Sequence, residues 1–117
     1  MFADWNALLG TLRKSFTRLA GPNPKLVDAY RNLNASLGSN GALDAKTREL
    51  IALAVAVTTR CDGCIASHAA AAVKAGATEA ELSDALGTAI ALNAGAAYVY
   101  SLRAMEAFQQ NQQETTA

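Results

Sequence analysis

The sequence lacks an excess of charge of either sign. Ten basic and ten acidic residues cancel, and no run of Lys or Arg is longer than the pair Arg13-Lys14. A chain without a basic patch has no surface that neutralises the phosphates of a nucleic acid. We therefore expect no nucleic-acid partner.

Long hydrophobic runs are also absent. The longest, from Leu50 to Val57, is far shorter than the roughly 20 residues that a bilayer-spanning helix needs. The N-terminal stretch MFADWNALLGTLRKSF has no basic region followed by an unbroken apolar segment, so it does not resemble a signal peptide. The sequence predicts a cytoplasmic protein without a membrane segment.

Cysteine and histidine are scarce, and they are gathered in one place. The segment TTRCDGCIASH, residues 58–68, contains both cysteines and the only histidine of the 117-residue chain. In a reducing cytoplasm, two cysteines three positions apart are poor candidates for a permanent structural disulfide. They are more often redox-active or metal-binding. The segment is therefore where we expect chemistry.

The apolar residues of the N-terminal part recur at helical spacing. One stripe runs from Trp5 to Leu19 and predicts a first amphipathic helix. A second stripe follows Pro24, which suits the first turn of a helix, and Gly38 supplies a left-handed stop. This part of the chain predicts two helices.

The second half of the sequence predicts three more helices. Asp44 is a good N-cap for a helix whose run LIALAVAV is apolar on every face, as expected of a helix buried on all sides. A fourth helix is predicted over roughly 62–75. Thr78 and Glu81 form a capping box for a long fifth helix, with a break near 93–95. The predicted fold class is all-α.

We predict a single domain over residues 1–108, a bundle of five to six helices, followed by a frayed polar tail over 109–117. The tail, QQNQQETTA, has no apolar residue to anchor it. About a quarter of the residues are alanine, which leaves thin side chains to fill a core. A subunit interface would bury more surface, so we expect an oligomer.

The spacing of the cysteines and the histidine suits thiol chemistry. If a helix begins near residue 62, Cys64 and His68 share one face and Cys61 lies at the N-terminal edge, so the two sulfurs can meet. A helix N-terminus stabilises a thiolate, and Arg60 would act in the same direction. This argument favours Cys61 as the exposed thiolate, whereas His68, a potential proton acceptor, favours Cys64.

Glu49 is a further candidate for the site. It lies near the start of the apolar third helix, and antiparallel packing against the fourth helix would hold its carboxylate in a cleft near His68. A partly buried Glu beside a His can take part in a proton relay. The alternative is that Glu49 only complements the dipole of its own helix.

Two other interpretations of the cluster remain open. The cysteines could be small apolar residues that fill space. Alternatively, Cys61, Cys64 and His68 could bind zinc, and the fourth ligand would then have to be Glu49, water or another subunit. Asp62 is interpreted as a helix cap rather than a catalyst.

These residues match a known signature. Glu49, eleven intervening residues, the CDGC motif from Cys61 to Cys64, three more residues and His68 resemble the active site of one protein group. It is the alkylhydroperoxidase D-like branch of the carboxymuconolactone decarboxylase family. The surrounding sequence from 43 to 97 agrees as well. The resemblance implies an all-helical fold that assembles into homotrimers or homohexamers, with the cysteine pair in a pocket near subunit contacts.

The resemblance also implies an activity, that of a thiol-dependent peroxidase or disulfide reductase in antioxidant defence. By analogy, Cys64 attacks a hydroperoxide and becomes a sulfenic acid, Cys61 resolves it to a disulfide, and Glu49 and His68 relay the proton. A lipoyl-type or thioredoxin-like dithiol is the implied reductant, and a peroxiredoxin is the implied partner protein. No cofactor or metal is implied.

The sequence departs from the fuller family signature at Gly63, where a second histidine is expected. The proton relay therefore lacks one histidine, and we expect a lower peroxidase efficiency. Dithiol–disulfide exchange should be less affected. The alternative function is a redox-sensing or assembly module with little turnover. A lactone decarboxylase, which would have no use for the cysteine pair, and a zinc-binding domain are weaker alternatives.

Overall fold

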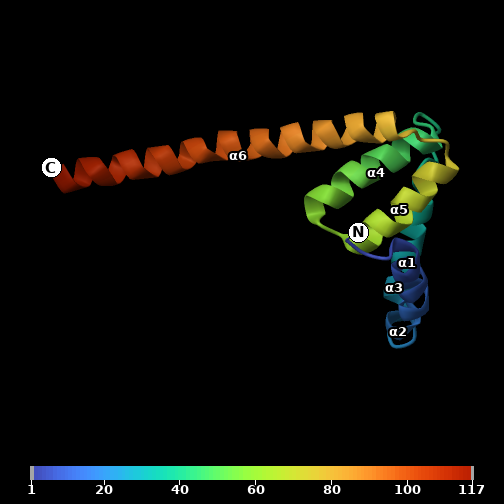
Figure 1. The fold of residues 1–117 in the computed structure, drawn as a ribbon. Helices are drawn as coiled ribbons and strands as arrows, with labels where there is room; N and C mark the ends of the chain where they lie inside the picture. Colours follow the sequence, from blue (N-terminus) through green and yellow to red (C-terminus); the bar gives the residue numbers. More distant parts are fainter. Residues whose placement is uncertain (1, 117) are drawn as a thin grey trace.

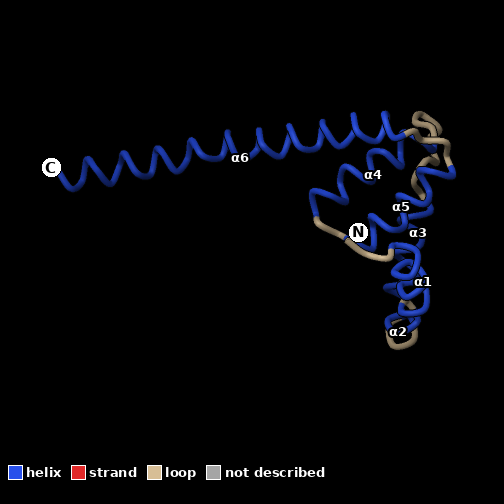
Figure 2. The backbone as a smooth tube through the Cα atoms, viewed as in Figure 1, coloured by secondary structure: helices blue, strands red, loops and turns tan. Residues whose placement is uncertain are grey.

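A computed structural model describes residues 2–116, which form helices and no strand. Figures 1 and 2 show their arrangement. In chain order the helices are α1 (Trp5–Ser15), α2 (Thr17–Ala20), α3 (Pro24–Ala35), α4 (Ala45–Thr59), α5 (Asp62–Lys74) and α6 (Glu79–Thr116). The all-α prediction is confirmed. The predicted first helix is divided at Phe16, a turn residue that separates α1 from α2.

Side-chain caps set the helix boundaries where the sequence predicted them. Asp44 Oδ1 accepts the N–H of Thr47 at 2.8 Å and begins α4. At the start of α6 the Glu81 N–H donates to Thr78 Oγ1 at 3.1 Å, and the Thr78 N–H donates to Glu81 Oε1 at 3.0 Å. Gly38, predicted to stop α3, has a left-handed φ of 80°, but it lies beyond the end of the helix, whose C-cap is Ser36. The boundaries therefore follow from local polar chemistry.

Helix α6 is continuous where a break near 93–95 was predicted. The side-chain amide of Asn93 donates to the Ala89 carbonyl and to Thr58 Oγ1, both at 2.8 Å. Its polar group is thus satisfied without interrupting the backbone hydrogen bonds of the helix. The prediction of a break is wrong.

The polar end of the chain also differs from the prediction of a frayed tail. Residues 109–116 continue α6 to Thr116, and Ala117 lies outside the described residues. Gln and Glu are good helix formers. In addition, Asn111 Nδ2 donates to the Ala107 carbonyl at 2.9 Å and Thr115 Oγ1 to the Asn111 carbonyl at 2.9 Å.

Helices α4, α5 and α6 form the centre of the molecule. The chain reverses at Arg60, whose φ of 56° is left-handed, so α5 runs back along α4. Helix α6 then runs parallel to α4, because Lys46 pairs with Glu81 near the starts of the two helices and Thr58 with Asn93 further along. Helix α1 packs on α5, and α2 and α3 extend beyond it (Figure 1).

The core of the chain is small. Its buried apolar residues among those described are one leucine and four alanines: Leu53, Ala56, Ala66, Ala72 and Ala89. Helix α4 was predicted to be buried on all sides, yet Ile51 is 49% and Val55 is 55% exposed. That prediction is wrong for one chain, because α5 and α6 leave part of α4 uncovered.

Helix α6 is the one helix of the described residues that is long and apolar enough to cross a membrane. Its most apolar 18-residue window has a mean hydropathy of 1.2. Length and composition alone do not assign a membrane segment, since a core helix of a soluble protein passes the same test. The sequence-based prediction of no membrane segment is not tested by this feature.

We expect the pairing of α4 with α6 to weaken at acid pH. The hydrogen bond from Lys46, 2.7 Å from Glu81 Oε2, and those from Thr78 hold the pKa of Glu81 below its usual value near 4.5. A carboxyl whose pKa is lower in the folded chain stabilises the fold above its unfolded pKa. The stabilisation is lost as the pH falls through the folded pKa.

The check is thermal unfolding followed by circular dichroism between about pH 5 and about pH 3. Glu81→Gln should lower Tm at neutral pH and should lose less Tm on acidification than wild type. Glu79→Gln, in the same turn of α6, is the matched control and should behave as wild type. If acidification lowered the Tm of wild type and of Glu81→Gln by the same amount, the result would contradict the role of the Lys46–Glu81 pair.

Candidate active site

The two cysteines lie at the N-terminus of α5. Cys61 and Cys64 form a disulfide, with Cα atoms 5.2 Å apart, a separation typical of disulfides. Cys61 is the N-cap of α5, and its Sγ accepts the N–H of Cys64 at 3.2 Å. The predicted meeting of the sulfurs is confirmed. The Cys61 sulfur occupies the position where a helix best stabilises negative charge.

The cap of α5 was expected to be Asp62, and the structure assigns it to Cys61 instead. Asp62 is the first residue of the helix, and its carboxylate is the acidic group of the first turn. The side chain that bonds the free N–H is the sulfur one position earlier. The interpretation of Asp62 as the cap is therefore wrong, and the capping atom is part of the redox pair.

Glu49 and His68 are brought together by the antiparallel packing of α4 and α5. Glu49 Oε2 lies 2.6 Å from His68 Nδ1, across 19 positions of sequence. Their side chains are 23% and 30% exposed, respectively, so water screens the contact only in part. Glu49 thus does more than complement the dipole of its own helix.

The contact defines the proton chemistry of the imidazole. When His68 is neutral and its Nδ1–H donates to Glu49, Nε2 is the nitrogen that can accept a proton. Cys64 and His68 are four residues apart within α5 and share one face of the helix. Sulfur, imidazole and carboxylate thus follow one another in the order of a nucleophile, its base and the group that orients the base.

Helix α1 covers the motif between the cysteines. A Cβ atom added to Gly63 would lie 2.9 Å from Leu12 Cδ1, closer than side chains approach one another. Leu12 therefore occupies space into which a side chain at position 63 would project. This is the position at which the resemblance places a second histidine. The contact between Leu12 and Gly63 was not predicted from the sequence, where the available signal was a glycine in a helical turn that requires no special backbone conformation.

We expect Gly63→His to destabilise the fold by about 1 to 3 kcal/mol, the usual cost of overpacking a filled site. Gly63→Ala should stay within about 1 kcal/mol of wild type, because the gain in helix propensity offsets a rotation of the Leu12 methyl group. Urea denaturation of both variants measures these differences.

The contact itself is tested by a double-mutant cycle. Leu12→Ala creates space, so Gly63→His in that background should cost less than in wild type. Leu9→Ala, also on α1, is the control background. Equal costs of Gly63→His in the wild-type, Leu12→Ala and Leu9→Ala backgrounds would show that Leu12 does not fill this space.

The site lies outside two hollows of the single chain. The larger, about 610 Å³, lies along α2 and α3 and is lined by residues between Phe16 and Ala35. The smaller, about 340 Å³, lies between α4 and α6. The cysteines, Glu49 and His68 line neither of them. On one chain the cysteine pair is a half-buried surface feature.

The residues of the zinc interpretation pair with one another in the oxidised chain. Residues 2–116 contain no group of three or more His, Cys, Asp or Glu side chains arranged to hold a metal ion. The two sulfurs are bonded to each other, and His68 Nδ1 is bonded to Glu49. In this state each sulfur bonds the other sulfur and the imidazole Nδ1 bonds a carboxylate, so these atoms do not converge on one point.

Comparisons with known proteins agree on one family. The carboxymuconolactone decarboxylase family model matches residues 24–107, which contain all four candidate residues. An uncharacterized protein of Haemophilus influenzae is 61% identical over 108 residues, covering 92% of this chain and 96% of its own length. Uncharacterized protein 4 of the cox locus of Paracoccus denitrificans is 40% identical over 78 residues, covering 67% and 70%.

A solved structure supports the same relationship. The crystal structure of an apo carboxymuconolactone decarboxylase family protein from Legionella pneumophila has a TM-score of 0.70 to this chain and 34% sequence identity. The match covers 91% of this chain and 95% of that one.

Proposed function

Because the chain belongs to the carboxymuconolactone decarboxylase family, we propose that it is a thiol-dependent peroxidase and disulfide oxidoreductase of the alkylhydroperoxidase D-like branch. The observation that carries the proposal is the Cys61–Cys64 disulfide at the N-terminus of α5, with the His68–Glu49 pair one helical turn beyond it. The proposed substrates are hydroperoxides, and the proposed role is antioxidant defence in the cytoplasm.

The first step oxidises Cys64. Its thiolate attacks one oxygen of the hydroperoxide, an S–O bond forms and the O–O bond breaks. The leaving alkoxide takes a proton and departs as an alcohol, while Cys64 becomes a sulfenic acid. His68 is one turn from Cys64 and fixed by Glu49. It removes the proton of the thiol and returns one to the leaving oxygen.

The second step forms the disulfide. Cys61 attacks the Cys64 sulfur, an S–S bond forms and the S–O bond breaks, and the hydroxide leaves as water after protonation. The N–H of Cys64, which the Cys61 sulfur accepts at 3.2 Å, favours Cys61 as a thiolate. The same contact helps reduction, since a dithiol that attacks Cys64 displaces Cys61, the better stabilised leaving thiolate.

The reductant in this proposal is a dithiol. A lipoyl-type or thioredoxin-like dithiol donates two electrons and two protons, restores both thiols and becomes a disulfide itself. A peroxiredoxin is the protein that the couple would serve in turn. The resemblance implies a homotrimer or homohexamer, and the large apolar side chains exposed on α3, α4, α5 and α6 support assembly.

Steady-state turnover tests the proposal. Purified protein is mixed with cumene hydroperoxide and excess dihydrolipoate, and peroxide consumption per chain is counted. An enzyme consumes many equivalents, whereas a redox sensor consumes about one. Turnover no faster than that of dihydrolipoate alone would overturn the proposal.

A redox-sensing module is the second candidate function, and one observation favours it. Leu12 occupies the space beside Gly63 where the family's second histidine would stand, so a group of the proton relay is missing. A sensor requires oxidation without rapid turnover. A decarboxylase is not favoured, because the disulfide and its histidine would have no part in that reaction.

A further inference from the structure

The single chain exposes far more surface than a compact domain of its mass. Its accessible surface is 9286 Å², whereas a folded monomer of 12.1 kDa is expected to expose about 6,000 Å². The Cα radius of gyration is 20.1 Å, against about 13 Å for a compact domain of this length. The surplus of about 3,000 Å² exceeds the roughly 1,000 to 2,500 Å² that one chain contributes to an obligate interface.

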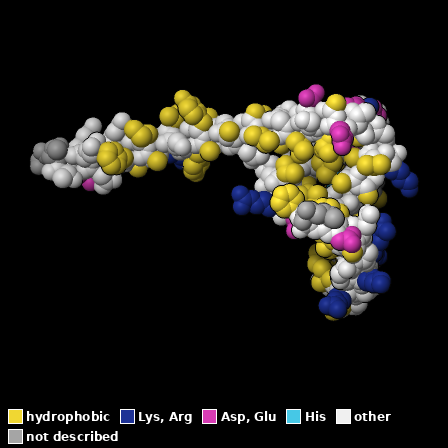
Figure 3. All heavy atoms as spheres, viewed as in Figure 1, with side chains coloured by type: hydrophobic (Ala, Val, Ile, Leu, Met, Phe, Trp, Pro, Cys, Tyr) yellow, Lys and Arg dark blue, Asp and Glu magenta, His cyan; other side chains and the backbone are white. Residues whose placement is uncertain are grey.

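Much of the surplus lies on the C-terminal part of α6, residues 94–116, which we call the arm. Helix α6 packs against α4 and against no other helix of the described residues. Beyond Asn93 the helix projects away from the other elements over about 34 Å (Figures 1 and 3). Six large apolar side chains of the arm are more than half exposed: Tyr98, Val99, Tyr100, Leu102, Met105 and Phe108.

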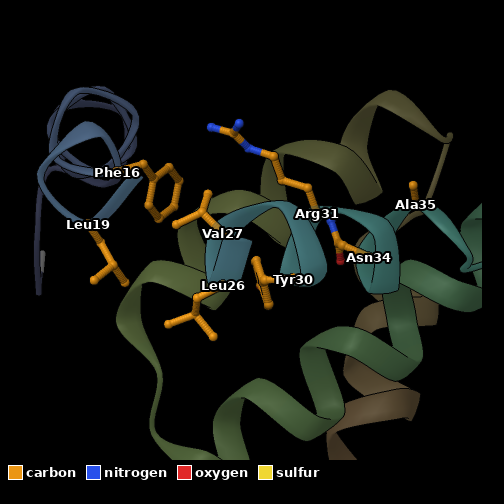
Figure 4. Close-up of a pocket in the computed structure, with 8 residues that line it drawn as sticks. All are labelled: Phe16, Leu19, Leu26, Val27, Tyr30, Arg31, Asn34 and Ala35. Atoms are coloured by element: carbon orange, nitrogen blue, oxygen red, sulfur yellow. The ribbon is translucent and has the colours of Figure 1, made fainter. Parts of the chain in front are cut away.

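A matching apolar surface lies at the other end of the molecule. The hollow of about 610 Å³ along α2 and α3, which we call the groove, is shown in Figure 4. Four of its large apolar side chains are more than half exposed: Phe16, Leu19, Leu26 and Tyr30. Helix α3 packs against α2 and against no other helix of the described residues. The groove thus has the exposed apolar lining that a helix face would cover.

Charge distinguishes the two surfaces. Helices α1 to α3 carry five basic residues, Arg13, Lys14, Arg18, Lys25 and Arg31, against the single acidic residue Asp28. The arm carries two acidic residues, Glu106 and Glu114, against the single basic residue Arg103. Arg31 lines the groove and lies 4.0 Å from the exposed carboxylate of Asp28 in its own helix. Glu106 lies among the apolar residues of the arm. Surfaces of opposite charge favour docking of one on the other.

We infer that the arm of one copy docks in the groove between α2 and α3 of a second copy. The arm cannot reach the groove of its own chain, because α6 is one continuous helix that leads away from α3 (Figure 1). The apolar arm residues cover Phe16, Leu26 and Tyr30, and Arg31 is the counterion of Glu106. The inference concerns assembly and does not depend on the proposed redox activity.

The mass of full-length variants in solution tests the docking. Met105→Glu in the arm and Tyr30→Glu in the groove should each raise the dissociation constant of the assembly at least about 30-fold, as expected for central interface residues. Val73→Glu on α5, a residue exposed to a similar extent, is the matched control. It should leave the mass unchanged. Circular dichroism confirms that each variant is folded.

Mixing experiments identify which surface meets which. The Met105→Glu chain keeps an intact groove and the Tyr30→Glu chain keeps an intact arm, so an equimolar mixture should form a one-to-one complex that neither forms alone. In the same way, Glu106→Arg combined with Arg31→Glu should restore the assembly that each single change weakens. If the mixture stays dissociated, the arm does not dock in the groove.

Two further outcomes would overturn the inference. One is a wild-type chain that remains monomeric at micromolar concentration. The other is a wild-type chain that co-sediments with vesicles of neutral or anionic phospholipid through the arm, so that Met105→Glu abolishes the co-sedimentation. Neither outcome affects peroxide turnover by itself, so failure of this inference and failure of the redox proposal are distinguishable.

Discussion

Cys64→Ser is expected to abolish oxidation by hydroperoxide, whereas Cys61→Ser is expected to react once and stop as a sulfenic acid on Cys64. The reason is the division of labour in the site. In the proposed mechanism His68, one helical turn beyond Cys64, is its base, and Cys61 at the N-cap of α5 supplies the second sulfur. Without Cys61 no S–S bond can form within the chain.

Single-turnover experiments with reduced variants measure this difference. Each variant is mixed with one equivalent of cumene hydroperoxide and quenched with a reagent that traps sulfenic acids, and the adduct is located by mass spectrometry. Ser67→Ala, an exposed change on α5, is the control and should form the disulfide as wild type does. A trapped sulfenic acid on Cys61 in Cys64→Ser, with an inert Cys61→Ser, would reverse the assigned roles.

His68→Ala is expected to slow peroxide reduction by about 100-fold, the lower range for loss of a general base. Glu49→Gln should have a smaller effect, because an amide still bonds His68 Nδ1 but no longer stabilises the charged imidazole. Glu49 acts through His68, from which it lies 2.6 Å. The double variant should therefore be no slower than His68→Ala alone.

The pH dependence of the oxidation rate separates this role from a purely structural one. In wild type the rate should follow the protonation of the thiol and imidazole pair, and in His68→Ala it should follow the thiol alone. Glu79→Gln on α6 removes a carboxylate outside the site and serves as the control. Multiplicative losses in the Glu49→Gln/His68→Ala variant would indicate that the two residues act independently.

Local signals explain what could be predicted from the sequence. Asp44 as a cap and Thr78 with Glu81 as a capping box depend on groups a few positions apart. The pairing of Glu49 with His68 could be anticipated because two helices joined by the short turn at Arg60 pack antiparallel. Each of these features needs only the residues of neighbouring elements.

The features that sequence reasoning missed depend on tertiary contacts. Leu12 meets Gly63 across fifty-one positions, and no periodicity links the two residues. The run of α4 from Leu50 to Val57 is apolar on every face. This pattern indicates that the run is covered, but it does not indicate by which chain. The sequence therefore led to the expectation of burial within one chain, whereas Ile51 and Val55 are half exposed.

The measurement that tests the account most directly is the stopped-flow oxidation of the fully reduced wild-type protein by an organic hydroperoxide, with thiols counted before and after. The account predicts loss of both thiols, Cys61 and Cys64, at a rate at least about 100-fold above that of a free cysteine. Oxidation no faster than that of free cysteine, with no dependence on His68, would contradict the assignment of this site as a peroxidase.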